Sequence, residues 1–144
     1  MTVVRHAQID FGVRIEPRLE DLRPDPDTGY SKTHFHFCRV HYPEMSVSGL
    51  TTPRGTGLLL YIKLSVTGNE SELIRRYRIN NPAFPHQTTL DQFFDQEQFE
   101  AYRQLGVHAA QVLFQSALMN ESQPRSVPDW FKQLSKNLLD PANA

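Results

Sequence analysis

Three histidines in residues 33–42 (THFHFCRVHY) are the first residues whose type and spacing could do chemistry. In a strand, His34 and His36 lie on one face, because successive side chains alternate between the two faces. Imidazole pairs of this spacing occur in metal sites. His41 has the opposite parity, and no H-x-x-x-H or C-x-x-C motif completes a ligand set. The pattern favours a half-buried strand face, and we predict no bound metal.

Two further residues are candidates for a functional role. His86 follows Pro85 in a turn, where packing gives no reason for a histidine. Lys63 lies in the apolar segment 57–66. Together with His34 and His36 they complete the candidate set. We predict no catalytic residue and no cofactor.

Nucleophilic chemistry finds little support in the sequence. Cys38 lies in the middle of a strand pattern, where a small buried hydrophobic residue is the favoured interpretation. A serine hydrolase needs its nucleophile in a G-x-S-x-G turn between a strand and a helix. The nearest segment, Met45–Gly49 (MSVSG), lacks the leading glycine. The chain alone is therefore not expected to be an enzyme.

Charge sets limits on the partners. The net charge is −1 and the isoelectric point is about 6.6, so the broad basic footprint of a nucleic-acid-binding protein is absent. Arg75, Arg76 and Arg78 form a local basic patch that could meet phosphate or a membrane surface. Glu70 and Glu72 lie beside it, which favours a solvated or ion-paired helix face.

Two strand patterns must position the histidines and Lys63. One is 33–42, and the other is 57–66 (GLLLYIKLSV), which is apolar on both faces through Ile62 and therefore predicts a central strand buried on both sides. We expect the two strands to pair antiparallel around a long, flexible connection at 43–56. Residues 13–17 (VRIEP) form a third, shorter strand pattern.

The helix signals surround these strands. Gly12 is placed to end a helix over 2–10, Asn69 to cap one over 69–81, and Asp95 to cap one that reaches about Met119. Gln98 stands in capping-box position after Asp95. A short helix is expected to begin at Leu90-Asp91, and an amphipathic helix to cover 130–139. Aromatic residues at helical spacing are expected to pack in a core: Phe93, Phe94, Phe99 and Tyr102.

These elements predict an α+β fold, with a small antiparallel β unit of two to three strands followed by three to four helices. The length of 144 residues suits one domain, which we divide into a main segment at 1–121 and a C-terminal amphipathic helix and tail at 122–144. The first residues lack the apolar region of a Sec signal peptide, and the single cysteine fits a reducing compartment. We expect a cytoplasmic protein, with membrane association through the arginine patch left open.

The chain resembles the C-terminal segment of bacterial patatin-like phospholipase family proteins over about three-quarters of its length. The matching blocks are His6–Glu16 (HAQIDFGVRIE), Val40–Pro43 (VHYP), Leu59–Glu70 (LLYIKLSVTGNE) and Tyr77–Gly106. The last block is the longest and most specific. It follows the pattern Y-x-x-x-x-P-x-F-P-H-x-[ST]-T-x-D-Q-x-F-x-x-x-Q-F-E-x-Y-R-x-L-G.

The resemblance implies a relation to lipid acyl hydrolases that use a Ser–Asp dyad. Their Ser in G-x-S-x-G, their Asp in D-G-G or D-G-A and their glycine-rich oxyanion loop all lie upstream of the matched segment, and this chain contains none of them. We therefore expect a non-catalytic or truncated relative with a structural or interaction role. Two alternatives stay open: a part of an active phospholipase completed by an upstream or partner chain, and a small metal- or ligand-binding module using His34 and His36.

Partners are expected for the same reason. In a full patatin-like domain the strand at 57–66 would be covered on both faces, and alone it must be covered by the chain's own helices or expose an apolar patch. We expect a homo-oligomer or a partner chain to cover it, or else marginal stability.

Overall fold

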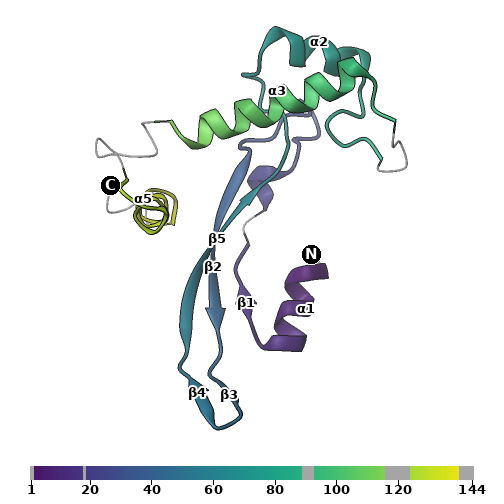
Figure 1. The fold of residues 1–144 in the computed structure, drawn as a ribbon. Coiled ribbons are helices and arrows are strands. Elements are labelled where there is room, and N and C mark those ends of the chain that lie inside the picture. Colours follow the sequence, from purple (N-terminus) through teal and green to yellow (C-terminus); the bar gives the residue numbers. More distant parts are fainter. Residues whose placement is uncertain (1, 18, 89–92, 116–123, 140–144) are drawn as a thin grey trace. The chain divides into compact units, whose positions relative to one another are not determined.

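A computed structural model describes residues 2–17, 19–88, 93–115 and 124–139 (Figure 1). The chain divides into two compact units. Unit 1 comprises Met1–Arg18, His36–Tyr61 and Met119–Ala144, and unit 2 comprises Leu19–Phe35 and Ile62–Leu118. The fold class is α+β with small antiparallel sheets, as predicted. The predicted boundary at residues 121 and 122 lies outside the described residues and stays a prediction.

Unit 1 is built on a β-hairpin. Figure 1 shows the paired strands β2 and β5 with the short strands β3 and β4 at their far end. The helices and strands of unit 1 are α1 (Thr2–Phe11), β1 (Arg14–Ile15), β2 (Phe35–Tyr42), β3 (Met45–Val47), β4 (Leu50–Thr52), β5 (Gly55–Ile62) and α5 (Val127–Leu139). One end residue of β2 and one of β5 belong to unit 2.

The start of unit 1 follows the local sequence signals. Helix α1 ends at Phe11, and Gly12 has φ of +64°, a conformation that costs glycine little because it has no Cβ. The Gly12 N–H donates to the carbonyl of Gln8 at 3.0 Å and satisfies one of the last helical carbonyls. Strand β1 then pairs antiparallel with β2, with Ile15 opposite Val40. The predicted helix end and strand are confirmed.

The prediction of a flexible connection at 43–56 is wrong. Strands β3 and β4 pair antiparallel there, with Val47 opposite Leu50. Both residues of the two-residue turn have positive φ, +53° at Ser48 and +82° at Gly49, which is the backbone of a tight hairpin turn. The Ser-Gly pair between two short apolar-polar runs was the signal for this turn.

The prediction that β5 is a central strand is also wrong. The three-stranded sheet has the order β1-β2-β5, so within the described residues β2 is central and β5 lies at the edge. Leu59, Tyr61 and Ile62 are 40–50% exposed. A central position needs a partner strand on each side, and the third described strand of this sheet pairs with β2 instead. The strand therefore exposes apolar side chains, one of the two outcomes expected for it.

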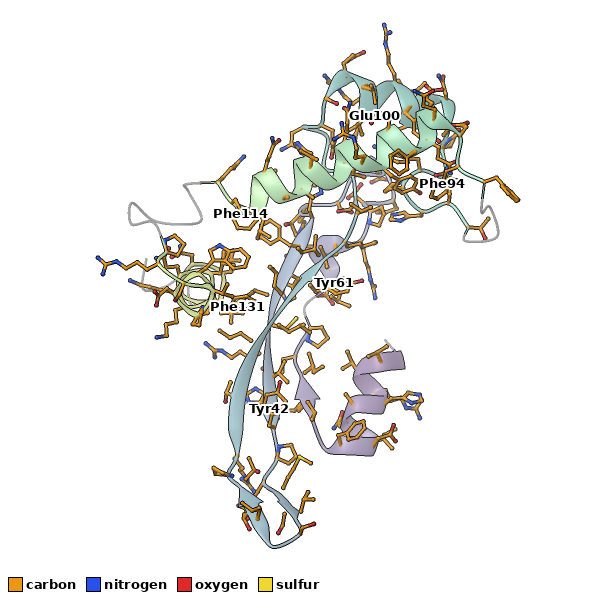
Figure 2. The ribbon with its side chains drawn as sticks, in the orientation of Figure 1. Tyr42, Tyr61, Phe94, Glu100, Phe114 and Phe131 are labelled. Atoms are coloured by element: carbon orange, nitrogen blue, oxygen red, sulfur yellow. The ribbon has the colours of Figure 1, made fainter. Side chains whose placement is uncertain are left out.

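The buried side chains of unit 1 lie on β2 and α5. Phe37, Cys38, Val40 and Leu134 are the buried hydrophobic residues of this unit. The rings of Phe37 and Phe131 pack with centroids 5.5 Å apart. Figure 2 labels Phe131 on α5. Along the hairpin, a Cβ on Gly57 would lie 2.8 Å from the Tyr42 ring, so a glycine lets this ring lie across β5. The predicted C-terminal helix is confirmed and begins earlier, at Val127.

Unit 2 holds two packed helices, α2 (Glu72–Asn80) and α3 (Gln96–Leu113), and the short 3-10 helix η1 (Glu20–Leu22). Tyr77, Phe84 and Tyr102 form a chain of edge-on rings, with centroids 5.1 Å apart for the first pair and 4.9 Å for the second. Such edge-to-face packing is the preferred geometry of aromatic pairs. The core around them contains Leu64, Val66, Ile74, Ala101 and Leu105.

The aromatic residues before and within α3 pack less than the spacing predicts. Phe93 is 91% exposed, Phe99 is 60% exposed, and Phe94 is half-exposed while it stacks on Tyr102 with centroids 5.6 Å apart. Tyr102 alone of the four joins the core cluster. The predicted core packing of Phe93 and Phe99 is therefore wrong, while Phe94 packs on Tyr102 and stays half-exposed. The buried residues of α3 include Ala101, Leu105 and Ala109 instead.

The helix ends of unit 2 agree with some of the local signals. Asp95 caps α3, and its carboxylate accepts the Gln98 N–H at 2.7 Å, as predicted. The cap of α2 is Ser71 and not Asn69, whose side chain is bound elsewhere. The described helix α3 ends at Leu113, before Met119, which lies outside the described residues. The helix expected from Leu90-Asp91 falls on residues 89–92, also outside them.

Candidate functional site

A polar turn at 67–70 in unit 2 is the base of the candidate site. The Glu70 carboxylate accepts the backbone N–H groups of Thr67 and Gly68, the second at 2.9 Å. Gly68 has φ of +94°, a conformation that favours glycine. Burial alone would raise the pKa of Glu70, but backbone N–H groups that bind the carboxylate hold it below its usual value of 4.5. Glu70 is therefore an ionised carboxylate although it is 4% exposed.

Two histidines meet this turn from distant parts of the chain. His34 precedes β2 and His108 lies on α3, and their rings pack edge to face with centroids 5.2 Å apart at 86°. One ligand-type atom from each of His34, Glu70 and His108 lies within 4.8 Å of the other two. Among the described residues this is the group of three such side chains that could hold a metal ion.

Burial sets the protonation state of His34. Its side chain is 1% exposed, and this burial lowers its pKa below 6.5 because it disfavours the charged imidazolium. His108 acts in the same direction, while Glu70 opposes it. His34 is therefore neutral at pH 7, which is the form that can accept a proton or bind a metal ion.

Thr67 and Asn69 connect the three side chains. The Thr67 hydroxyl oxygen lies 3.2 Å from His34 Nε2, 3.1 Å from Glu70 Oε1 and 2.7 Å from Asn69 Oδ1. Asn69 Oδ1 also lies 2.9 Å from His108 Nε2. The network orients both imidazoles, and it explains why Asn69 does not cap α2. His34 Nδ1 is buried and has no hydrogen-bond partner among the described residues.

One member of this group, His34, was named from the sequence and considered together with His36. His34 belongs to the group, while His36 lies in unit 1, is half-buried, and is not part of it. Glu70 and His108 were missed as partners. Glu70 lies 36 positions after His34, and His108 lies 38 positions after Glu70. No local motif connects residues at such separations. The shared strand face suggested His36, but His34 precedes the strand, and the chain places its side chain in unit 2.

Lys63 and His86 lie apart from the group. Lys63 Nζ donates to the carbonyl of Leu22 at 3.2 Å, which ties β5's end to η1 within unit 2. The His86 side chain is largely exposed, and its backbone N–H donates to Ala83 at 2.6 Å. Partial burial lowers the pKa of His86, and Lys63 and Arg78 act in the same direction. The bond to Leu22 gives Lys63 a contact within the fold. Functional roles for Lys63 and His86 stay predictions.

Two alternative sites are explained by ordinary packing and pairing. Cys38 is 1% exposed, and burial raises the pKa of its thiol, so the nucleophilic thiolate is disfavoured. Arg75 and Arg76 pair with Glu72 at 3.3 and 3.4 Å. Arg78 donates to the Gly29 carbonyl at 2.8 Å and lies over the Tyr30 ring. The predicted ion-paired helix face is confirmed for Arg75 and Arg76.

Comparison of the chain with protein-family models, curated proteins and solved structures finds no match. Among the helices that the structure describes, none has both the length and the apolar character needed to cross a membrane.

Proposed function

We propose that this chain is a non-catalytic relative of the C-terminal segment of patatin-like lipid acyl hydrolases and that it has a structural or interaction role. The observation that carries the proposal is the position of the residues that resemble that family. In the block Tyr77–Gly106, the pattern residues Tyr77, Phe84 and Leu105 are at most 4% exposed. They build the core of unit 2, so their role in this chain is packing.

The preceding block, Leu59–Glu70, has a similar character. Lys63 bonds the Leu22 carbonyl, and the Ser65 hydroxyl donates to the Thr33 carbonyl at 3.0 Å. Thr67 and Gly68 donate to Glu70. Each polar residue of the K-x-S-x-T-G-x-E pattern therefore has a hydrogen-bonding role in the fold of unit 2. This supports a structural role, because these bonds join segments of unit 2 and close the turn at 67–70.

The chemistry of the family supports the same conclusion. A Ser–Asp dyad needs a serine that the Asp can deprotonate, together with backbone N–H groups that stabilise the oxyanion. The chain contains no G-x-S-x-G and no D-G-G or D-G-A sequence. The one serine in the four matching blocks, Ser65, is fully buried and donates to a carbonyl. Acyl transfer by this chain alone therefore lacks a nucleophile and an oxyanion hole.

A partner chain that completes a hydrolase is the second candidate. The exposed apolar side chains of β5 favour it, because an edge strand with Leu59, Tyr61 and Ile62 exposed offers both unpaired backbone groups and apolar surface. A second copy of the chain is the alternative cover. Sedimentation velocity at several concentrations tests the second copy as the cover. We expect the wild-type chain to self-associate, and we expect Leu59→Lys with Tyr61→Lys to weaken that association. A monomeric wild-type chain with high, cooperative thermal stability would contradict the expectation that β5 needs a cover from another chain.

The activity test uses the purified full chain with p-nitrophenyl esters and phospholipid vesicles. We expect no turnover above buffer and no labelling by a fluorophosphonate, which reacts with activated serines. Turnover or labelling that one serine substitution abolishes would overturn the non-catalytic proposal. Mixing the chain with a protein encoded directly upstream that carries G-x-S-x-G tests the second candidate, which requires a faster rate for the mixture than for that protein alone.

A further inference from the structure

The group of His34, Glu70 and His108 has the composition of a metal site. Two imidazoles and one carboxylate from separate segments form the ligand set of many three-ligand zinc sites, which leave one position open. These residue types together favour zinc and other late divalent transition metals over magnesium or calcium, which prefer oxygen ligands alone.

The distances allow such a site with small side-chain movements. The ligand-type atoms lie within 4.8 Å of one another, whereas tetrahedral zinc with bonds of about 2.0–2.1 Å places its ligands roughly 3.4 Å apart. The three atoms therefore need to move inward by about 1 Å or less each. Rotation of the half-buried His108 can supply part of this movement, because His108 borders an open cavity of about 210 Å³ lined also by Ser71, Arg103 and Gln104.

A second observation points to a ligand. His34 is 1% exposed, and its Nδ1 makes no hydrogen bond of good geometry among the described residues, although the backbone of Ser65 lies near enough to the ring to raise its pKa. A buried polar atom without a partner is rare in folded proteins and calls for an explanation. A metal ion bound through Nδ1 would satisfy this atom.

The protonation states of His34 and Glu70, and the hydrogen bonds around the three side chains, also suit a metal site. Burial keeps His34 neutral and the backbone N–H groups keep Glu70 ionised, which are the states that bind metal. Asn69 contacts His108, and Gly68 contacts the Glu70 carboxylate. Outer hydrogen bonds of this kind orient metal ligands.

We propose that His34, Glu70 and His108 bind one divalent transition-metal ion, Zn²⁺ in the first place, within unit 2. The Thr67 hydroxyl now lies between His34 and Glu70, and it shifts outward to remain a hydrogen-bond partner of Glu70 when the ion enters. The proposal goes beyond the relation to patatin-like proteins and does not depend on it. It also replaces the pairing of His34 with His36 by a pairing with His108.

The test uses the full chain without a histidine tag, stripped of metal by a chelator and then dialysed against ZnCl₂. We expect one zinc per chain by elemental analysis, and visible absorption typical of tetrahedral coordination when Co²⁺ replaces zinc. His108→Gln is the principal variant because His108 is half-buried, and we expect it to weaken zinc binding more than roughly tenfold. His36→Gln is the matched control and is expected to bind as the wild type does.

Two results would overturn the proposal. One is a wild-type chain that retains no zinc after dialysis, and the other is a His108→Gln variant that binds zinc as tightly as the wild type. Far-UV circular dichroism of the metal-free variants shows whether each has folded. Glu70→Gln is a second variant, and its loss of zinc binding counts as support where its spectrum matches that of the wild type. Failure of this test leaves the proposed relation to patatin-like proteins untouched, since that relation is tested by activity.

Discussion

Unit 1 and unit 2 bury their apolar side chains in different ways. Unit 2 packs two helices around a cluster of aromatic and aliphatic side chains, and closes its turn at 67–70 with bonds to Glu70. Unit 1 is built on a hairpin whose outer strands β3 and β4 are exposed at every residue. Among the described residues of unit 1, the buried hydrophobic ones lie on β2 and α5. The comparison teaches that this chain concentrates the close packing of aromatic and aliphatic side chains in unit 2. The two longest of the blocks 6–16, 40–43, 59–70 and 77–106 also lie mostly in unit 2.

The largest effect is expected from the aromatic core of unit 2. Phe84 is 2% exposed and contacts two rings, so Phe84→Ala should lower the free energy of unfolding by about 3–5 kcal/mol through lost burial and a cavity. Phe93→Ala is the matched control, since Phe93 is 91% exposed, and should change it by less than about 0.5 kcal/mol. Urea unfolding followed by far-UV circular dichroism measures both. Equal effects of the two variants would contradict the core assignment.

Unit 1 has a comparable test in α5. Leu134 is fully buried, and Leu134→Ala should lower the free energy of unfolding by about 2–4 kcal/mol. The sole tryptophan, Trp130, lies on the same helix, so its fluorescence follows unit 1 during urea unfolding. Leu50→Ala at the exposed hairpin end is the control and should be nearly neutral. An unchanged fluorescence midpoint in Leu134→Ala would show that α5 contributes little to unit 1.

The helix caps of unit 2 should differ from one another. The Asp95 side chain accepts a backbone N–H, so Asp95→Ala should cost about 1 kcal/mol. Ser71 occupies the cap of α2 without a side-chain cap bond, so Ser71→Ala should cost less than about 0.5 kcal/mol. Thermal unfolding of both variants beside the wild type gives the comparison. A larger loss for Ser71→Ala would mean that its hydroxyl supports α2 by another contact.

The last effect is a pH dependence from the polar cluster of unit 2, for which the direction is fixed. Burial lowers the pKa of His34 in the folded state, so below pH 6.5 the unfolded chain takes up the proton first. The stabilisation from a neutral His34 is therefore present above about pH 6.5 and is lost as the pH falls towards the folded pKa. One group contributes at most about 1.4 kcal/mol per pH unit. Urea midpoints of metal-free protein at several pH values measure it.

His34→Gln is the variant that tests this assignment. It should have a flatter dependence of the urea midpoint on pH than the wild type, because the substituted side chain does not titrate. His86→Gln provides a comparison, since the pKa of His86 is lowered in the same direction but its side chain is largely exposed. If His34→Gln keeps the full wild-type pH dependence, the cluster does not control it.

Local signals predicted the helix ends well where one residue can satisfy a backbone group by itself. Gly12 after α1 and Asp95 before α3 are such residues, because a positive φ and a cap bond depend on the neighbouring few residues. Asn69 has the same capping ability, but a tertiary partner, His108, binds its side chain. The hairpin at Ser48 and Gly49 was also readable from the turn pair, although the length of the connection suggested a loop.

The patterns of apolar residues predicted the type of each element better than they predicted which side chains are buried. The segment 57–66 was recognised as a strand, yet its apolar run could not show that β5 lies at a sheet edge, since edge and centre depend on which other strands pair. The helical spacing of Phe99 and Tyr102 was right, but the buried face of α3 includes the small residues Ala101 and Ala109, while Phe99 is exposed. Periodicity defines a helix face, and the neighbouring element decides which face is covered.

The amino-acid sequence by itself determined the α+β class, the helix starts and ends that rest on single residues, and the absence of a patatin-type catalytic motif. Tertiary structure alone decided that His34 meets Glu70 and His108, that Phe84 is buried while Phe93 is exposed, and that β5 is an edge strand. The physical reason is the separation along the sequence between the groups that interact. Backbone groups at turns and caps are satisfied within a few residues, whereas burial and polar clusters join segments more than thirty residues apart, whose meeting no local pattern encodes.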